Sequence, residues 1–265
     1  PDQSSAASDV YKRQKEFFAE QKALFEQPTR ISPWRDKCKR LKENKVDYGF
    51  FLRFNKKLQN MSPDEFIDKI LSKLNIKYLM VGDDFKFGKE RSGDFDFLSD
   101  WGSNNQIEVD RIPTHSFEGR RVSSTWIRES IADGNFDLAA KLLDRRYTFS
   151  GKVVFGNKVG RTIGVPTANI WVPKSNLPIK GVYAVKALVK GETFNGIANM
   201  GVRPTVGGTS PVLEIHIFDF NEEIYGCRIE VEFYQKIRNE KKFENLDKLK
   251  EQINLDIAET RKYFS

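Results

Sequence analysis

The chain has 265 residues, 39% of them hydrophobic, and its 44 Lys and Arg against 37 Asp and Glu give a net charge of +7. This length suffices for two ordinary domains with packed cores, and the isolation of Cys38 from Cys227 argues against a disulfide framework or a structural zinc site. No segment approaches the roughly 20 apolar residues that cross a bilayer, so we expect a cytoplasmic protein that uses no membrane.

Signals for strands and helices alternate in the first part of the chain. The run 46–54 is rich in β-forming residues, and 62–76 reads as a helix because Ser62 and Glu65 form a capping box before an apolar stripe. The run 77–82 reads as the next strand. Strand, helix and strand at this spacing predict a parallel βαβ unit, whose ligands bind beyond the carboxyl ends of the strands.

The pattern of secondary-structure signals changes near Arg146. Before it, a strand is expected near 106–112 and a pair of helices within 123–144, separated by Gly134 and Asn135. After it, β-rich runs follow one another without helices, which predicts a closed barrel or a sandwich. These runs are 147–155, 167–172, 182–190, 193–200, 212–220 and 227–237. A capped amphipathic helix over 245–264 ends the chain, with its buried side formed by Leu246, Leu249, Ile253 and Ile257.

The stretch GKVVFGNKVGRTIGVPTANI, residues 151–170, combines glycines and cations with two neutral oxygens. In an extended chain Thr167 and Asn169 point to one face, where a hydroxyl and an amide oxygen suffice for magnesium that arrives with a nucleotide. Alternatively, these two side chains simply face water at the start of a strand. Lys158, Arg161 and the upstream glycines favour a phosphate site. The glycines are Gly151, Gly156, Gly160 and Gly164.

A second candidate lies in PVLEIHIFDF, where the period of two places Glu214, His216 and Phe218 on one face. Such a face is usually just solvated. A kinase that acts on an alcohol, however, needs one carboxylate to orient the hydroxyl and take its proton. Glu214 is the best-placed carboxylate for that role if its strand borders the glycine loop.

For two further segments, the residues fit either a binding site or ordinary local structure. RVSSTWIR offers hydroxyls, the amides of a helix start, Arg121 and Arg128 to an anion, or it is an ordinary serine cap with basic neighbours. In GDDFKFGKERSGD, Asp83 and Asp84 either hold a ribose or a metal, or they are only turn-forming residues.

In this order, the segments resemble the bacterial bifunctional riboflavin kinase/FAD synthetase family. The resemblance rests on VGDDFKFGKERSGDF, RVSSTWIR, GRTIGVPTANI, KGVYAV, IANMGVRPTV, LEIHIFDF, IYG and KIRNEKKF. It implies a six-stranded β-barrel with a final helix over 146–265, which transfers the γ-phosphate of MgATP to the 5'-hydroxyl of riboflavin. It also implies an α/β, Rossmann-like nucleotidyltransferase domain over 28–145 that joins AMP to FMN, after a leader or disordered segment over 1–27.

The resemblance also assigns roles to individual residues. By motif, Thr167 and Asn169 are the magnesium ligands and Glu214 is the catalytic base. The loop that covers ATP contains Gly156, Lys158, Gly160, Arg161 and Gly164. The flavin side contains Asn199, Arg203 and Arg238. The phosphate site of the adenylyltransferase half contains Arg121, Ser124, Thr125 and Arg128. ATP, riboflavin and FMN are the partners that follow.

One departure from the family pattern concerns its Gly-x-Phe-Asp-Gly-x-His-x-Gly-His segment, which stabilises charge on the transferred phosphate. The histidines of this sequence are His115 and His216, and neither lies in such a setting. The aligned part of the nucleotidyltransferase domain therefore lacks its first βα unit. We expect an intact kinase half and a disabled FAD-forming half.

Two functions of other classes are weighed against the kinase. The isoelectric point near 9.2 and a barrel resembling an OB-fold would suit a nucleic-acid-binding module, but the basic residues are not gathered on one strand face. A flavin-binding regulator without catalysis is the other alternative. The sequence does not determine the oligomeric state.

Overall fold

The computed structural model describes residues 29–156, 160, 164–172, 177–205 and 208–265, with the backbone alone over 202–205 and 208–210. Contacts divide the described chain into two compact units. The first unit contains Cys38–Arg121, and the second contains Pro28–Lys37 together with Val122–Ser265. Helix α2 (Trp34–Glu43) contributes residues to both.

The first unit has an α/β core. Its parallel strands β1 (Tyr78–Gly82) and β2 (Glu108–Ile112) are joined by a connection that contains α5 (Phe95–Asn104). Ile67, Val81, Phe87 and Leu98 are the buried centre of its hydrophobic core. The remaining elements are α3 (Lys56–Gln59), α4 (Pro63–Lys69), η1 (Leu71–Lys73), η2 (Lys89–Arg91), β3 (Ser116–Phe117) and β4 (Arg120–Arg121).

The capping box predicted for the helix after residue 62 is confirmed. Glu65 N–H donates to Ser62 Oγ over 3.1 Å, and Ser62 N–H donates to the Glu65 carboxylate over 3.1 Å. The helix itself is shorter than expected, because α4 ends at Lys69 and a separate 3-10 turn, η1, follows.

The prediction of a strand over 46–54 is wrong. This segment has no strand structure, and Tyr48 and Phe50 are 82% and 56% exposed. The composition suits a half-buried pleated surface, but among the described residues β1 pairs with β2 and no strand pairs with 46–54. A parallel βαβ unit is therefore present, but it consists of β1, α5 and β2 and not of the three predicted segments.

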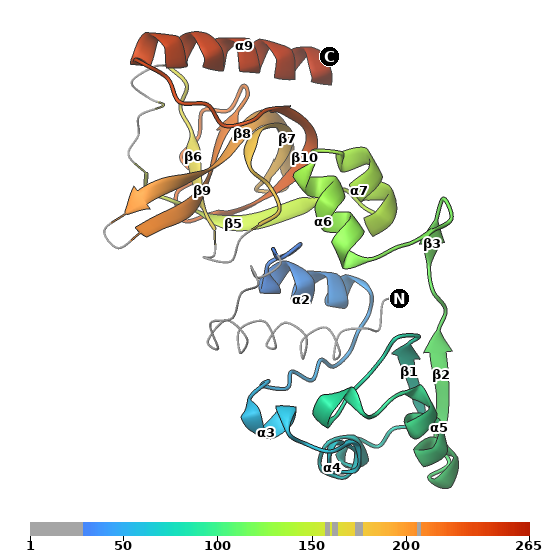
Figure 1. The fold of residues 1–265 in the computed structure, drawn as a ribbon. Coiled ribbons are helices and arrows are strands. Elements are labelled where there is room, and N and C mark those ends of the chain that lie inside the picture. The colour runs from blue at the N-terminus through green and yellow to red at the C-terminus, as the bar shows by residue number, and fades with distance from the viewer. Residues whose placement is uncertain (1–28, 157–159, 161–163, 173–176, 206–207) are drawn as a thin grey trace. The chain divides into compact units, whose positions relative to one another are not determined.

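The second unit is the predicted six-stranded closed barrel with a C-terminal helix (Figure 1). The strands pair in the order β10-β5-β6-β9-β8-β7. Helices α6 (Ser124–Ala132) and α7 (Phe136–Leu143) precede the barrel in the same unit, separated by Gly134 at φ +80. The strands are β5 (Thr148–Val154), β6 (Ala168–Trp171), β7 (Gly181–Val189), β8 (Glu192–Thr205), β9 (Gly208–Ile217) and β10 (Arg228–Arg238).

Alternate residues of these strands fill the barrel interior. On β9, Leu213 and Ile215 are fully buried, as the period of two predicts, while Glu214 and His216 face the other way. Helix α9 (Leu246–Phe264) lies across the outer side of β7, β8 and β10. The outer side of the barrel is therefore partly covered and does not face water everywhere.

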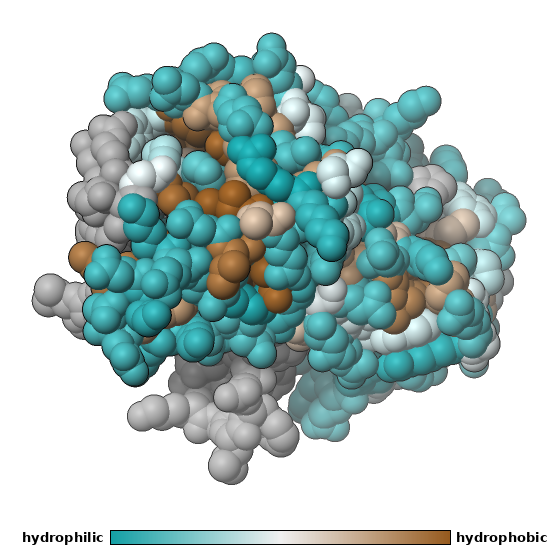
Figure 2. All heavy atoms as spheres, turned by 90° about the horizontal axis from the view of Figure 1, so that it is seen from above, coloured by the Kyte–Doolittle hydropathy of each residue, from teal (hydrophilic) through white to brown (hydrophobic). Residues whose placement is uncertain are grey.

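The buried side of α9 differs from the expected one at its first residue. Leu246 is 58% exposed, whereas Ile257 packs against the apolar cluster formed by Val182, Ile197 and Phe218 on the barrel. The face that carries α9 shows brown apolar side chains scattered between teal polar ones (Figure 2). Leu246 is the first residue of α9, directly after the cap residue Asn245.

Two buried tyrosines in the barrel provide a matched test of hydrogen bonding in its core. Tyr147 and Tyr183 are fully buried and both pack against Phe136 and Phe233. Tyr183 Oη accepts from Lys180 N–H over 2.8 Å and donates to Lys180 O over 2.7 Å, and burial raises its pKa to about 12. Tyr147 Oη has no hydrogen-bond partner among the described residues.

We therefore expect opposite effects from the same substitution. Tyr147→Phe removes an unsatisfied hydroxyl and should raise the free energy of unfolding by about 1 kcal/mol, whereas Tyr183→Phe should lower it by about 1–3 kcal/mol. Urea unfolding followed by circular dichroism measures both. A Tyr147→Phe protein less stable than Tyr183→Phe would contradict this reading of the core.

Candidate active site

The strand register of the barrel lines up the polar residues of its outer face. Asn169 on β6 lies opposite Glu214 on β9, and Glu214 lies opposite Asn199 on β8. Asn199 is paired with Val182 on β7, and Val182 with Arg238 on β10. Directly opposed residues in antiparallel strands have Cβ atoms about 5 Å apart. Asn169, Glu214 and Asn199 therefore form one continuous row.

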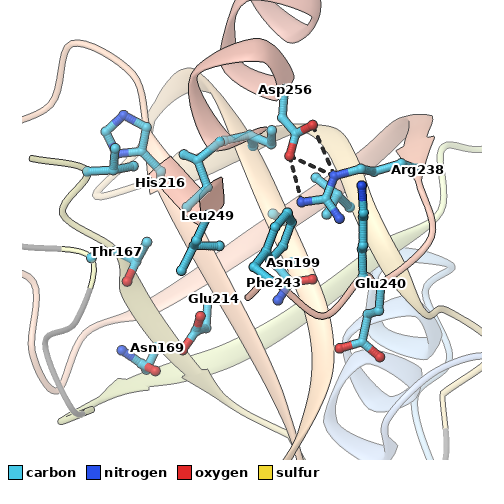
Figure 3. A pocket seen from close by; sticks show the side chains of 17 residues that line it. Thr167, Asn169, Asn199, Glu214, His216, Arg238, Glu240, Phe243, Leu249 and Asp256 are labelled. Atoms are coloured by element: carbon cyan, nitrogen blue, oxygen red, sulfur yellow. Dashed lines mark hydrogen bonds and ion pairs between the residues drawn. The ribbon is translucent and has the colours of Figure 1, made fainter. Parts of the chain in front are cut away.

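This row forms the floor of a pocket. The other walls come from the 239–245 connection, through Phe243, and from α9, through Leu249, Ile253 and Asp256. Figure 3 shows the side chains of Thr167, Asn169 and Glu214 on one side of the pocket and those of Arg238 and Asp256 on the other. The structure thus brings Thr167, Asn169 and Glu214 into one pocket, and their individual roles stay predictions.

The glycines before Thr167 lie against its side chain and that of Asn169. A Cβ atom on Gly156 would meet the amide of Asn169 at 2.3 Å, and one on Gly160 would meet Val165 O at 2.3 Å and Thr167 Oγ1 at 3.2 Å. The backbone therefore approaches this corner more closely than any side chain would allow. Gly164 adopts φ +80, which favours glycine. Lys158 and Arg161 lie outside the described residues.

His216 also belongs to the pocket, although the sequence reading gave it no role. Its Nδ1 lies 2.8 Å from the carbonyl oxygen of Pro166, immediately before Thr167. Because a carbonyl only accepts hydrogen bonds, Nδ1 carries the proton. The contact ties β9 to the corner that holds Thr167. Sequence spacing could not reveal it, because His216 and Pro166 are 50 residues apart.

On the expected flavin side, the structure places Asn199 and Arg238 in the pocket and leaves the side chain of Arg203 undescribed. Arg238 forms an ion pair with Asp256, whose side chain is 4% exposed. Asp256 was missed by the sequence reading. A signal for it exists, because a carboxylate beside Ile253 and Ile257 interrupts the apolar stripe of α9, and a charge in such a stripe is rarely buried without a partner.

The residues expected to bind phosphate in the adenylyltransferase half are divided between the two units. Arg121 lies in the first unit, and its Nη2 atom is 2.8 Å from Asp83 and 3.3 Å from Asp84. A hydrogen bond from Thr114 and the charge of Arg121 lower the pKa of Asp83. Ser124, Thr125 and Arg128 lie in the second unit. This phosphate site therefore remains a prediction.

The start of α6 matches the alternative reading of an ordinary serine cap. Ser123 Oγ accepts a hydrogen bond from Trp126 N–H over 3.2 Å. Arg128 Nε donates to the carbonyl oxygen of Thr29 over 2.6 Å. Helix capping accounts for the Ser123 contact without a bound anion, and the Arg128 contact reaches a residue 99 positions away in the sequence.

No group of three or more His, Cys, Asp or Glu is arranged to hold a metal ion within the described ranges. Across the same part of the chain, no helix combines the length and apolar character that spanning a membrane requires.

Comparison with known proteins identifies both parts of the chain. Residues 143–264 match the riboflavin kinase family model, and residues 11–126 match the FAD synthetase family model. The chain is 45% identical to the bifunctional riboflavin kinase/FMN adenylyltransferase of Haemophilus influenzae over 90% of its length and 78% of the relative's. It is 42% identical to the Escherichia coli K12 protein of the same name over 94% and 79% of the two chains.

A solved structure agrees on the fold. The crystal structure of a protein named macrolide-efflux protein, from Streptococcus pneumoniae, is 31% identical with a TM-score of 0.77, and the match covers 91% of this chain and 79% of that one. The barrel and the two family models define a flavin-nucleotide-synthesising enzyme with a kinase part and a nucleotidyltransferase part. The chain belongs to the bifunctional riboflavin kinase/FMN adenylyltransferase family.

The close approach of the glycine backbone to Asn169 generates a prediction. Gly156→Ala places a methyl group against the Asn169 amide, so the KM for ATP in the riboflavin kinase assay should rise by about tenfold or more, a loss of about 1.4 kcal/mol. Gly82→Ala is the matched control, because its Cβ would make only an ordinary contact of 3.5 Å. An unchanged KM for ATP in Gly156→Ala would show that this loop does not contribute to ATP binding.

Proposed function

We propose that the second unit transfers the γ-phosphate of ATP to the 5'-hydroxyl of riboflavin, with Mg²⁺ bound to the nucleotide, and so produces FMN. ATP and riboflavin are the substrates that the family implies. The observation that carries the proposal is the strand register, which puts Glu214 on β9 directly opposite both Asn169 on β6 and Asn199 on β8. One carboxylate between two neutral polar residues suits a base that accepts a single proton.

The Thr167 corner suits the phosphates. Gly156 and Gly160 let the backbone lie directly against Asn169 and Thr167, and the described residues of the pocket offer these two neutral oxygens there. A hard cation that arrives with the triphosphate needs few protein charges, because the phosphates supply them. When bound, Mg²⁺ would neutralise charge on the β- and γ-phosphate oxygens, and Thr167 and Asn169 would hold it.

Glu214 then acts on the hydroxyl. The ribityl 5'-oxygen forms a bond to the γ-phosphorus, the bond between that phosphorus and the bridging oxygen of ADP breaks, and the hydroxyl proton passes to the Glu214 carboxylate. Asn169 and Asn199 on the neighbouring strands orient the groups on either side of this carboxylate. Because phosphoryl transfer depends mainly on positioning and electrostatics, a rigid barrel wall suits the reaction.

The opposite end of the pocket suits the flavin ring. Val182 and Ile197 on the barrel face Phe243, Leu249 and Ile253 from the connection and α9. An apolar slot with one amide, Asn199, at its edge fits a flat aromatic ring with a polar rim. In this arrangement the ring lies under α9 and the ribityl chain runs along the row toward Glu214.

Conversion of Glu214 to the neutral amide tests the proposed base. Glu214→Gln keeps the shape and removes the proton acceptor, so kcat for FMN formation should fall by about 100- to 10,000-fold, while riboflavin binding stays within about threefold. Coupled detection of ADP and fluorescence titration of riboflavin measure the two quantities. Glu192→Gln, at an exposed strand start outside the pocket, is the control. A Glu214→Gln protein with full turnover would remove Glu214 from the mechanism.

The second activity of the family is the adenylylation of FMN to FAD. We propose that this 265-residue chain forms no FAD from FMN by itself, because its histidines, His115 and His216, do not form the paired-histidine segment that the family resemblance calls for. Incubation of the chain with FMN and MgATP should therefore yield no FAD by chromatography, while riboflavin and MgATP yield FMN. FAD at the rate of FMN formation would overturn this proposal and leave the kinase proposal intact.

A further inference from the structure

Arg238 and Asp256 form a densely hydrogen-bonded ion pair at the pocket. Arg238 Nε donates to both carboxylate oxygens of Asp256, over 3.0 and 2.9 Å, and Nη2 lies 2.7 Å from Oδ2. Arg238 Nη1 donates to Asn239 O over 3.0 Å. Asp256 Oδ1 also accepts from Gln252 Nε2 over 2.9 Å. The dashed lines in Figure 3 mark the ion pair.

This pair joins two elements that form different walls of the pocket. Arg238 ends β10 and continues the row of paired residues through Val182, whereas Asp256 comes from α9. Their side chains are 21% and 4% exposed. A charge this deeply buried is strongly destabilising once its partner is removed, so the pair fixes the position of α9 over the barrel.

The side chains positioned by this contact are those that line the flavin end. Leu249 and Ile253 lie within two turns before Asp256 on α9 and line the pocket, and Phe243 lies with its ring 5.7 Å from the Arg238 guanidinium. Because the Nε, Nη1 and Nη2 atoms of Arg238 already donate within the protein, its main contacts are structural. The resemblance made Arg238 a residue of the flavin side, and its geometry suits a different task there.

We propose that Arg238 and Asp256 are positioning residues that hold Phe243, Leu249 and Ile253 as the roof over the flavin ring, and that they set riboflavin affinity without acting on the phosphates. This proposal rests on the proposed kinase function, since it takes the occupant of the apolar end to be riboflavin. ATP binds at the other end of the row, beside Thr167 and Asn169, so its affinity is independent of the pair.

The same helix carries a matched control. Arg261 forms a two-pronged ion pair with Asp219 over 3.1 and 3.0 Å, so it also links α9 to the barrel side, but both side chains are exposed and neither lines the pocket. Asp219 adopts φ +56, a conformation that asparagine tolerates well. Asp219→Asn therefore weakens an α9 contact of the same kind between two side chains that do not line the pocket.

The experiment compares Asp256→Asn and Arg238→Lys with Asp219→Asn. Riboflavin dissociation constants come from quenching of flavin fluorescence, KM values for ATP from the kinase assay, and folding from circular dichroism. The proposal predicts that Asp256→Asn weakens riboflavin binding by about tenfold or more while KM for ATP stays within about twofold. Arg238→Lys, which keeps the charge but loses the fork geometry, should show a smaller loss in the same direction, and Asp219→Asn should show neither change.

Each outcome decides the proposal. Unchanged riboflavin affinity in a folded Asp256→Asn protein overturns it, and so does an equal loss of riboflavin and ATP binding, which would mark a merely structural pair. If Asp256→Asn does not fold, the Arg238→Lys protein is the test: the proposal requires weaker riboflavin binding with an unchanged KM for ATP. Failure of the kinase function itself looks different, because the unmodified chain would then form no FMN from riboflavin and MgATP.

Discussion

The pairing of β6, β9 and β8 is the constraint from which the rest of the site follows. Asn169, Glu214 and Asn199 share a face because each lies opposite its neighbour in the hydrogen-bonded ladder. A slip of one residue on β9 would turn the Glu214 carboxylate into the barrel interior and place Leu213 and Ile215 on the outer face. Burial of an unpaired carboxylate and exposure of two core side chains both oppose that slip, so the hydrophobic core also enforces the register of the site.

The covered outer wall explains how a small barrel offers a pocket. The interior of this six-stranded barrel contains fully buried side chains such as Tyr183, Phe233 and Ile215, as is usual for small barrels. The site is built instead between the outer face and α9, where Phe218 and Ile257 join one apolar cluster. The Glu214 carboxylate and an apolar slot thus line one pocket, the carboxylate supplied by β9 and the slot completed by α9.

The sequence predicted the structure correctly at strand positions where a local rule decides which way a side chain points. The strand alternation that exposes Glu214 and the face shared by Thr167 and Asn169 follow from a period of two, which burial and strand pairing enforce. It failed where a distant partner decides. Residues 46–54 have β-forming composition but no strand beside them in the described chain, and Asp256 is buried only because Arg238 reaches it from β10. Such contacts depend on tertiary structure, which the period of one segment does not encode.

We propose that the Glu214 carboxylate, aligned by strand register with Thr167 and Asn169, accepts the proton of the flavin hydroxyl. A crystal structure of the chain with Mg²⁺, a non-hydrolysable ATP analogue and riboflavin is the decisive test. We expect a terminal ribityl oxygen within about 3 Å of the Glu214 carboxylate, with the analogue's terminal phosphate beside Thr167 and Asn169. A flavin whose ribityl chain ends away from Glu214, or a triphosphate bound elsewhere on the barrel, would contradict it.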